Sequence, residues 1–228
     1  MSKKLMFVAL SAILCLSLLL PVGCGNDTGS GGGDGTEILI GTVGPLSGGA
    51  ASYGTSILNA VKVAVDEANA SGELGDYVLR IISEDTEGDW AKAANAFSKL
   101  VESDGVSVIV GGVLSSESEA GGPIVLDGGV PTISPSSTAV GLTLNNPYLF
   151  RNCVSDEVQA IQIVEYAAND MGLGRFAVMY TNNDYGNSLN DAFAAAAPAL
   201  GEIVAVESFM DNDENFRPQL TKINQENP

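Results

Sequence analysis

The sequence contains no histidine, and this absence excludes several kinds of catalytic site. Ser-His-Asp and Cys-His nucleophilic sites need an imidazole as their base, and the commonest zinc sites need it as a ligand. The Ser-x-x-Lys pair, the G-x-S-x-G elbow and the two glycine-rich phosphate-binding motifs are also missing. We therefore expect no enzyme activity, no metal and no cofactor. Carboxylates are abundant, so a hydrolase that uses two acids stays open as an alternative.

Positive charge is scarce. The chain has 10 Lys and Arg against 28 Asp and Glu, a formal net charge of -18. Nucleic acid binding needs a basic surface, and so does attraction to anionic lipid headgroups, so neither partner is expected. The acids are scattered along the chain, which is typical of a solvated surface.

A long apolar run occurs only at the N-terminus. It spans residues 5–20, follows two lysines, and is followed by small residues and a cysteine. This order is typical of an export signal, and the run is shorter than the ~20 residues that span a bilayer. Pro21-Val22-Gly23-Cys24 resembles the bacterial lipobox, in which cleavage precedes a cysteine that becomes lipid-modified. We therefore predict a lipoprotein signal peptide at residues 1–23 and a lipid anchor on Cys24.

Cysteine is also scarce. Cys15 leaves with the signal and Cys24 carries the lipid, so Cys153 remains alone and no intramolecular disulfide is possible. We interpret Cys153 as a small buried hydrophobe rather than a reactive thiol. Residues 24–36 are rich in glycine and are predicted to form a flexible tether.

From residue 37 onward, the patterns typical of strands and helices alternate. Apolar, β-branched runs predict strands at 37–43, 77–83, 106–110, 130–133, 175–181 and 202–209, and residues 148–151 form either a short strand or a connector. Helical spacing of apolar residues predicts helices at 52–70, 89–102, 115–126, 157–171, 186–200 and 216–225. This alternation predicts an α/β fold with parallel sheets flanked by helices. A break near residues 144–155 predicts two lobes, 37–154 and a partial 155–228.

Ligands of open parallel sheets bind beyond the carboxyl ends of the strands. The loops at those ends are 44–53, 111–116, 134–140 and 182–186, and they carry hydroxyl residues, glycines and tyrosines. The helix start at Ser115 favours a carboxylate or phosphate, because its backbone N–H groups are free. The alternative is that Ser115 or Ser116 is simply an N-cap.

Two further features of these loops have both a structural and a binding interpretation. The turn Ser134-Pro135-Ser136-Ser137-Thr138 offers hydroxyl and backbone groups to an amino-acid head group, or it is an ordinary Ser/Pro turn. Tyr53 and Tyr185 precede helices and either shape an apolar slot or serve only in packing.

These segments resemble the type I periplasmic solute-binding proteins of branched-chain amino acid ABC transporters, the Leu/Ile/Val-binding family. The resemblance covers residues 37–228, in the order and spacing of that family. It is carried by Ile40-Gly41-Thr42-Val43-Gly44-Pro45-Leu46-Ser47-Gly48, Tyr53-Gly54, Glu84-Asp85-Thr86, Val110-Gly111-Gly112-Val113-Leu114-Ser115-Ser116, Val130-Pro131-Thr132-Ile133-Ser134-Pro135-Ser136-Ser137-Thr138 and Asn183-Asp184-Tyr185-Gly186.

The resemblance implies a two-lobed fold that closes over a small amino-acid-like ligand and passes it to a membrane permease. The protein would work in the periplasm or cell envelope, held to the membrane by its lipid alone. In that family, residues at the places of Ser115 and Thr138 hold the ligand's carboxylate and ammonium. Backbone groups at the places of Ser136 and Ser137 help, and tyrosines at the places of Tyr53 and Tyr185 line the cleft.

One departure from the family pattern is length. Family chains are substantially longer, and they supply an acidic partner for the ligand ammonium from a part of the second lobe beyond residue 228. We therefore expect an incomplete second lobe. Two other roles stay open for the same fold: a ligand-sensing domain of a signalling protein, and a structural envelope lipoprotein.

Overall fold

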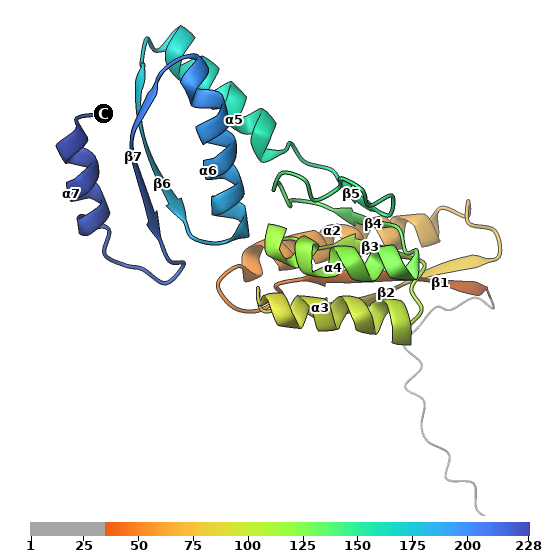
Figure 1. Cartoon of the computed structure of the whole chain (residues 1–228). Coiled ribbons are helices and arrows are strands. Elements are labelled where there is room, and N and C mark those ends of the chain that lie inside the picture. The colour runs from red at the N-terminus through yellow and green to blue at the C-terminus, as the bar shows by residue number, and fades with distance from the viewer. Residues whose placement is uncertain (1–34) are drawn as a thin grey trace, which may run out of the picture. The chain divides into compact units, whose positions relative to one another are not determined.

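The computed structural model describes residues 35–228. The predicted signal peptide, Cys24 and nearly all of the predicted tether lie outside these residues, so those predictions stay predictions. Within residues 35–228, no helix has the length and apolar character needed to cross a membrane. The described chain alternates strands and helices, as the sequence predicts (Figure 1).

The first sheet has five parallel strands in the order β2-β1-β3-β4-β5. Every pairing is parallel because a helix or a long connection separates consecutive strands. The order places β1 and β3 in the interior, where their apolar runs are covered on both faces. The strands are β1 (Thr36–Gly44), β2 (Tyr77–Asp85), β3 (Val108–Gly111), β4 (Thr132–Ser134) and β5 (Leu149–Arg151).

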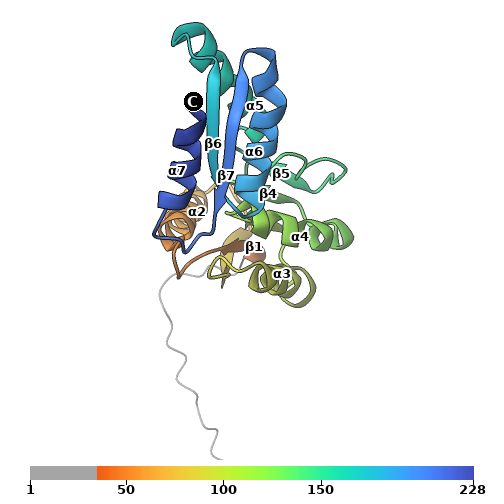
Figure 2. The ribbon, with the colours of Figure 1, turned by 60° about the vertical axis from the view of Figure 1, so that its left-hand side comes forward.

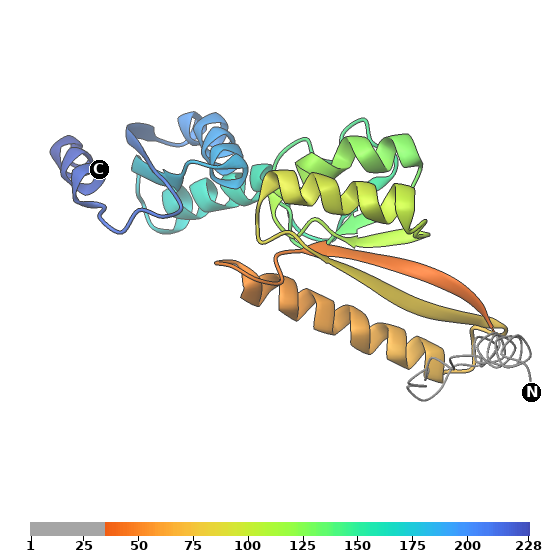
Figure 3. The same ribbon diagram turned by 90° about the horizontal axis from the view of Figure 1, so that it is seen from below.

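Helices cover both faces of this sheet. Helix α2 (Ala51–Ala70) lies on one face, while α3 (Trp90–Ser98) and α4 (Ser115–Gly128) lie side by side on the other (Figure 3). The core between the sheet and helices α3 and α4 includes Phe97, Leu100 and Ile109, each at most 1% exposed. The helix positions therefore follow from the apolar faces that the sequence predicts.

Three predicted helices change to another helical geometry at their C-terminal ends, two of them to a π-helical turn. The helix predicted at 89–102 begins as expected, because Asp89 accepts a hydrogen bond from the Lys92 N–H at 2.9 Å and caps α3. It then changes to a π-helical turn at Lys99–Ser103. The helix predicted at 157–171 is α5 (Asp156–Glu165) followed by a π-helical turn at Tyr166–Asp170. Hydrophobic spacing does not distinguish these wider turns from α-helix.

The second sheet pairs β6 (Arg175–Thr181) and β7 (Glu202–Phe209) in parallel, with the bounds predicted from sequence. Helices α5 and α6 (Asp184–Ala196) lie on one side of it and α7 (Arg217–Glu226) on the other (Figure 2). A 3-10 turn at Ala197–Ala199 follows α6. The core here is small, centred on Phe176, whose ring meets that of Phe193 edge-on at 5.6 Å.

Candidate ligand-binding site

A pocket of about 570 Å³ lies at the carboxyl ends of the strands. Its volume falls in the range of small-molecule sites, roughly 300–1,000 Å³. Five of the six residues proposed from sequence to bind ligand line this one pocket. The lining residues are Tyr53, Gly88, Trp90, Val113, Leu114, Ser115, Ser116, Ser136, Thr138, Asn183, Tyr185 and Asp211.

Ser137 is the sixth proposed residue, and it does not line the pocket. Its side chain is buried, and its hydroxyl donates to the Gly112 carbonyl at 2.7 Å. Its N–H donates to the Ser134 hydroxyl at 3.0 Å, and its carbonyl accepts from the Cys153 thiol at 3.2 Å. The groups that the sequence assigned to a ligand are thus occupied inside the protein, and Ser137 is a scaffold residue in this structure.

The scaffold beneath the pocket is a cluster of buried hydroxyls around one carbonyl. The Gly112 carbonyl accepts from Ser118, Ser134 and Ser137 at 2.9, 2.6 and 2.7 Å. These donors come from α4, from the end of β4 and from the turn after β4. The cluster therefore fixes the β3–α4 turn against the 134–138 turn, which brings Ser115 and Thr138 to the same pocket.

The start of α4 differs from the N-cap alternative, because neither serine caps the helix. The N-cap residue is Leu114, and its N–H donates at 3.0 Å to the carboxylate of Glu117. The Ser115 hydroxyl instead accepts from the Ala139 N–H at 3.3 Å. The N–H groups of Ser115 and Ser116 have no acceptor within the helix. Together with the helix dipole they form a site suited to a carboxylate at the pocket wall.

Two tyrosines lie on the pocket lining at the starts of α2 and α6, each followed by a glycine. A Cβ at Gly54 would lie 2.1 Å from the Pro45 carbonyl oxygen, and one at Gly186 would lie 1.9 Å from that of Thr181. Only glycine allows each helix to begin this close to the segment before it. Tyr53 and Tyr185 are 64% and 44% exposed, which leaves both rings free to contact a ligand.

Tyr53 and Tyr185 line the same pocket. Burial raises the pKa of the Tyr185 hydroxyl, and Asp156 and Tyr53 raise this pKa further. The two tyrosines therefore belong to one site although they come from α2 and α6.

Thr138 lines the pocket, but its hydroxyl oxygen is buried and has no hydrogen-bond partner within residues 35–228. Its carbonyl accepts from Arg151 and from the Asp156 N–H, both at 2.9 Å. The two carboxylate oxygens of Asp156 are likewise buried without a partner. A ligand would reach the Thr138 hydroxyl only after that side chain rotates toward the pocket.

Three lining residues lie outside the loops that the sequence identified: Gly88, Trp90 and Asp211. Asp211 is the one charged residue in the lining, and it is the second residue after β7. Its carboxylate accepts from the Asn183 amide at 3.0 and 3.2 Å and also from the Thr181 hydroxyl. The rule that ligands lie beyond strand ends applies equally to β2 and β7, and it would have identified the loops that carry Trp90 and Asp211.

Two other hollows have similar volumes, about 610 and 560 Å³. The first includes Glu119 and Asp184, and the second includes Glu157 and Asp191. Two carboxylates and no basic residue in each lining disfavour an anionic head group. The pocket at the start of α4 is therefore the better candidate site.

Comparison with known proteins agrees with this geometry. Residues 37–228 match the family model described as periplasmic binding protein. The chain therefore belongs to the periplasmic binding protein family, and the expected two-lobed α/β fold class is confirmed.

Individual relatives are Leu/Ile/Val-binding proteins. BraC3 of Rhizobium johnstonii is 32% identical over 195 residues, which are 83% of this chain and 52% of that protein. The Leu/Ile/Val-binding protein of Escherichia coli K12 is 26% identical over 193 residues, 84% of this chain and 52% of that protein. This chain thus spans about half the length of the curated relatives it matches.

Solved structures give the same result. The Thermotoga maritima leucine-binding protein LivK superposes with a TM-score of 0.78 at 27% identity, covering 84% of this chain and 54% of that one. LivJ of Streptococcus pneumoniae, solved with isoleucine, superposes with a TM-score of 0.75 at 34% identity, covering 83% and 54%.

Proposed function

We propose that this protein binds a zwitterionic amino acid, of the branched-chain type, in the pocket at the start of α4. The observation that carries the proposal is the pairing of two opposite features in one lining. The free N–H groups of Ser115 and Ser116 suit a carboxylate, and Asp211 suits an ammonium. A ligand with both groups satisfies both features.

The polar groups also make a ligand with only one charge a poorer match. A simple carboxylic acid would bring its negative charge into a pocket whose lining contains Asp211 and no basic residue. A simple amine would leave the start of α4 without an anion. Ser115 and Ser136 add hydroxyls at the head-group end, and rotation of Thr138 would add a third.

The rest of the lining suits an apolar side chain. Tyr53, Trp90 and Tyr185 contribute aromatic surface, and Val113 and Leu114 contribute aliphatic surface. The Streptococcus pneumoniae relative was solved with isoleucine, a side chain of suitable size for such a slot. We therefore place leucine, isoleucine and valine first among candidate ligands.

The proposed role is that of an extracytoplasmic lipoprotein that delivers its ligand to an ABC transporter permease. The membership of the periplasmic binding protein family supports this role, as do the predicted signal peptide and Cys24. The two lobes would be residues 37–154 and 155–228, and they would close by a hinge near residues 152–155. The alternative is a sensory domain of a signalling protein, and the neighbouring genes distinguish them, because a transport operon encodes a permease and ATPases.

The chain offers a direct reporter for the binding test. Trp90 is the single tryptophan of the sequence, and it lines the pocket. We expect leucine, isoleucine or valine to change Trp90 fluorescence and to give a saturable heat signal in calorimetry on the intact gene product. 4-Methylpentanoate, which is leucine without its amine, should bind at least tenfold more weakly. Equal binding of the two compounds would contradict the head-group assignment, and binding of no amino acid would contradict the proposed function.

A further inference from the structure

A buried carboxylate lies directly behind the pocket without lining it. Glu117 of α4 and Thr86 of the loop after β2 are each 0% exposed. The Thr86 hydroxyl donates to one carboxylate oxygen of Glu117, and the Leu114 N–H donates to the other at 3.0 Å. A buried carboxylate is unfavourable unless it is hydrogen-bonded, so both oxygens need these donors.

The pair connects two neighbouring walls of the pocket. The Thr86 hydroxyl also accepts from the Gly88 N–H at 3.1 Å, and the Thr86 N–H donates to the Gly44 carbonyl at 3.1 Å. Gly88 and Leu114 both line the pocket, on two neighbouring walls formed by the β2–α3 loop and the β3–α4 turn, and a Cβ at Gly88 would lie 3.6 Å from Leu114 Cδ1. These two walls are therefore joined through the side chains of Thr86 and Glu117.

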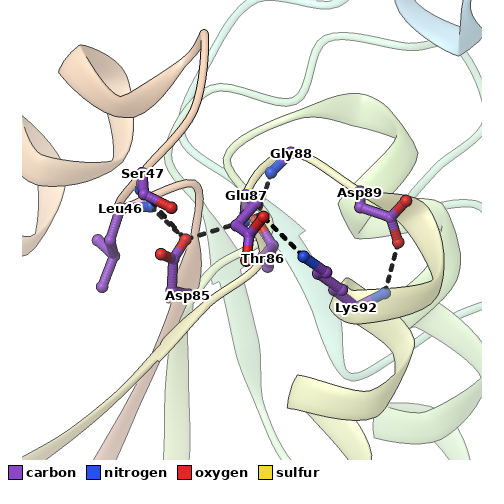
Figure 4. Close-up of polar contacts among 8 residues, drawn as sticks. All are labelled: Leu46, Ser47, Asp85, Thr86, Glu87, Gly88, Asp89 and Lys92. Atoms are coloured by element: carbon purple, nitrogen blue, oxygen red, sulfur yellow. Dashed lines mark hydrogen bonds and ion pairs between the residues drawn. The ribbon is translucent and has the colours of Figure 1, made fainter.

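The same loop holds further parts of the pocket in place (Figure 4). Asp85 accepts from the N–H groups of Leu46 and Ser47 at 2.8 and 3.2 Å, which fixes the segment that leads to α2 and Tyr53. Asp89 caps α3, whose first residue is Trp90. Loop 85–89 is thus bonded to the segments that carry three walls of the pocket.

We propose that Glu117 and Thr86 act together as a positioning pair for the ligand site. The pair holds Leu114 against the loop after β2 and so directs the free N–H groups of Ser115 and Ser116 into the pocket. Neither side chain reaches the ligand, because neither lines the pocket. The inference rests on the proposed function, since it concerns how that function's head-group site is oriented.

The test is a double-mutant cycle with Glu117→Gln and Thr86→Val. Each substitution keeps the side-chain shape and changes the hydrogen bonding. We expect each variant to bind leucine about tenfold more weakly than wild type, since a buried partner is left unsatisfied. The double variant should bind leucine at most about twofold more weakly than a single variant does, because the two residues act as a unit. Thr86→Ser should restore affinity.

A matched control lies in the same helix. Glu119 is exposed, two residues after Glu117, and lines a different hollow. Glu119→Gln makes the same chemical change, and we expect its affinity to stay within twofold of wild type. Affinities of Glu117→Gln and Thr86→Val within twofold of wild type would overturn the proposal, and so would fully additive losses.

A second readout does not depend on the ligand. Amide hydrogen exchange at Leu114 and Gly88 in the free protein should accelerate in each single variant, without further acceleration in the double variant. If wild type binds no amino acid, the proposed function fails, and this exchange measurement alone decides whether the pair holds the two walls. Unchanged exchange at both amides would overturn the pair. If Glu117→Gln does not fold, Thr86→Val and Thr86→Ser supply the same comparison.

Discussion

The two sides of the pocket are built differently. The wall from the first sheet stands on buried polar side chains that bond to one another or to the backbone, such as Glu117, Ser118, Ser134 and Ser137. Both sides present exposed lining residues, such as Tyr53 on the first and Tyr185 and Asp211 on the second, but residues 157–228 contribute no buried polar side chain beneath the second wall. Buried, satisfied networks are rigid. The comparison indicates that the first wall is preorganised, whereas the second supplies groups that complete the site.

The apolar cores of the two regions also differ, and the core under the first sheet is the more extensive. The core under the first sheet surrounds Phe97, Leu100 and Ile109, which are almost fully buried. The core beside the second sheet has three buried members, Val164, Phe176 and Ala197. Because buried apolar area supplies most of the stabilisation, the first region should contribute more to the stability of the described chain.

The largest expected effect is in this first core. Phe97→Ala should lower the free energy of unfolding by about 3–5 kcal/mol. Phe176→Ala should cost less, about 2 kcal/mol, because the smaller core around it relaxes more readily into the space. Urea unfolding followed by circular dichroism measures both. Leu126→Ala is the control, since Leu126 is 41% exposed and its loss should stay within about 0.5 kcal/mol. Equal costs for the two phenylalanines would remove the contrast between the cores.

The next effect concerns the second wall. Asp211→Asn should weaken leucine binding by about 2 kcal/mol, near thirtyfold, because a charge-assisted hydrogen bond to the ammonium is lost. Binding of 4-methylpentanoate should not weaken, since that compound has no ammonium. Asp127→Asn removes the same charge at an exposed position of α4 and should leave both affinities unchanged. Equal losses for both ligands would mean that Asp211 acts only through the fold.

Substitutions of Thr138 and Ser137 distinguish a residue of the pocket lining from a residue of the scaffold beneath it. Thr138→Ala should weaken ligand binding by ~1–3 kcal/mol if its hydroxyl turns toward the ligand on binding. Ser137→Ala should lower unfolding stability by about 1 kcal/mol and change affinity less than threefold, because its hydroxyl bonds to Gly112 inside the protein. Calorimetry and urea unfolding on both variants check this. An unchanged affinity in Thr138→Ala would show that the Thr138 hydroxyl does not bind the ligand.

The smallest expected effect is on the pH dependence of unfolding stability, to which Glu117 and Asp85, near loop 85–89, contribute with opposite signs. Burial chiefly raises the pKa of Glu117 above its usual 4.5, with the nearby charge of Asp85 adding to it. The folded state then holds a proton that the unfolded state releases, so stability falls as pH rises above about 4.5. Glu117→Gln should remove that fall.

Asp85 shows the reverse behaviour. Hydrogen bonds from the Ser47 side chain and from the Glu87, Leu46 and Ser47 backbone lower its pKa from 3.8 to about 2, although partial burial opposes them. Its stabilisation is present above pH 3.8 and is lost as pH falls through about 2. Asp85→Asn should flatten this acidic limb of the stability profile and leave the fall above pH 4.5 in place. Unfolding free energies of both variants between pH 2 and 7 measure the two slopes of the stability profile. The same pair of slopes in Glu117→Gln and in Asp85→Asn would contradict the assigned causes.

Much of the fold could be predicted because it depends on local patterns. The bounds of β6 and β7 follow from apolar, β-branched runs, and Asp89 caps α3 as its position before a helical pattern indicates. The meeting of Ser115 with Thr138 followed from one topological rule about parallel strands. The position of Ser137 outside the pocket lining could not be predicted, because which of three adjacent hydroxyl residues lines the pocket depends on packing around Gly112.

The amino-acid order by itself determined the alternation of strands and helices, the acidic surface and the loops that gather at the strand ends, since hydrophobic periodicity and turn residues act over a few positions. Only the tertiary structure decided that Glu117 bonds Thr86 as well as the N-cap N–H of Leu114, and that Asp211 joins Tyr53 in one lining. The Thr86–Glu117 contact joins residues that are 31 positions apart, and Tyr53 and Asp211 follow strands of different sheets. Both placements therefore depend on how the sheets and helices pack in three dimensions.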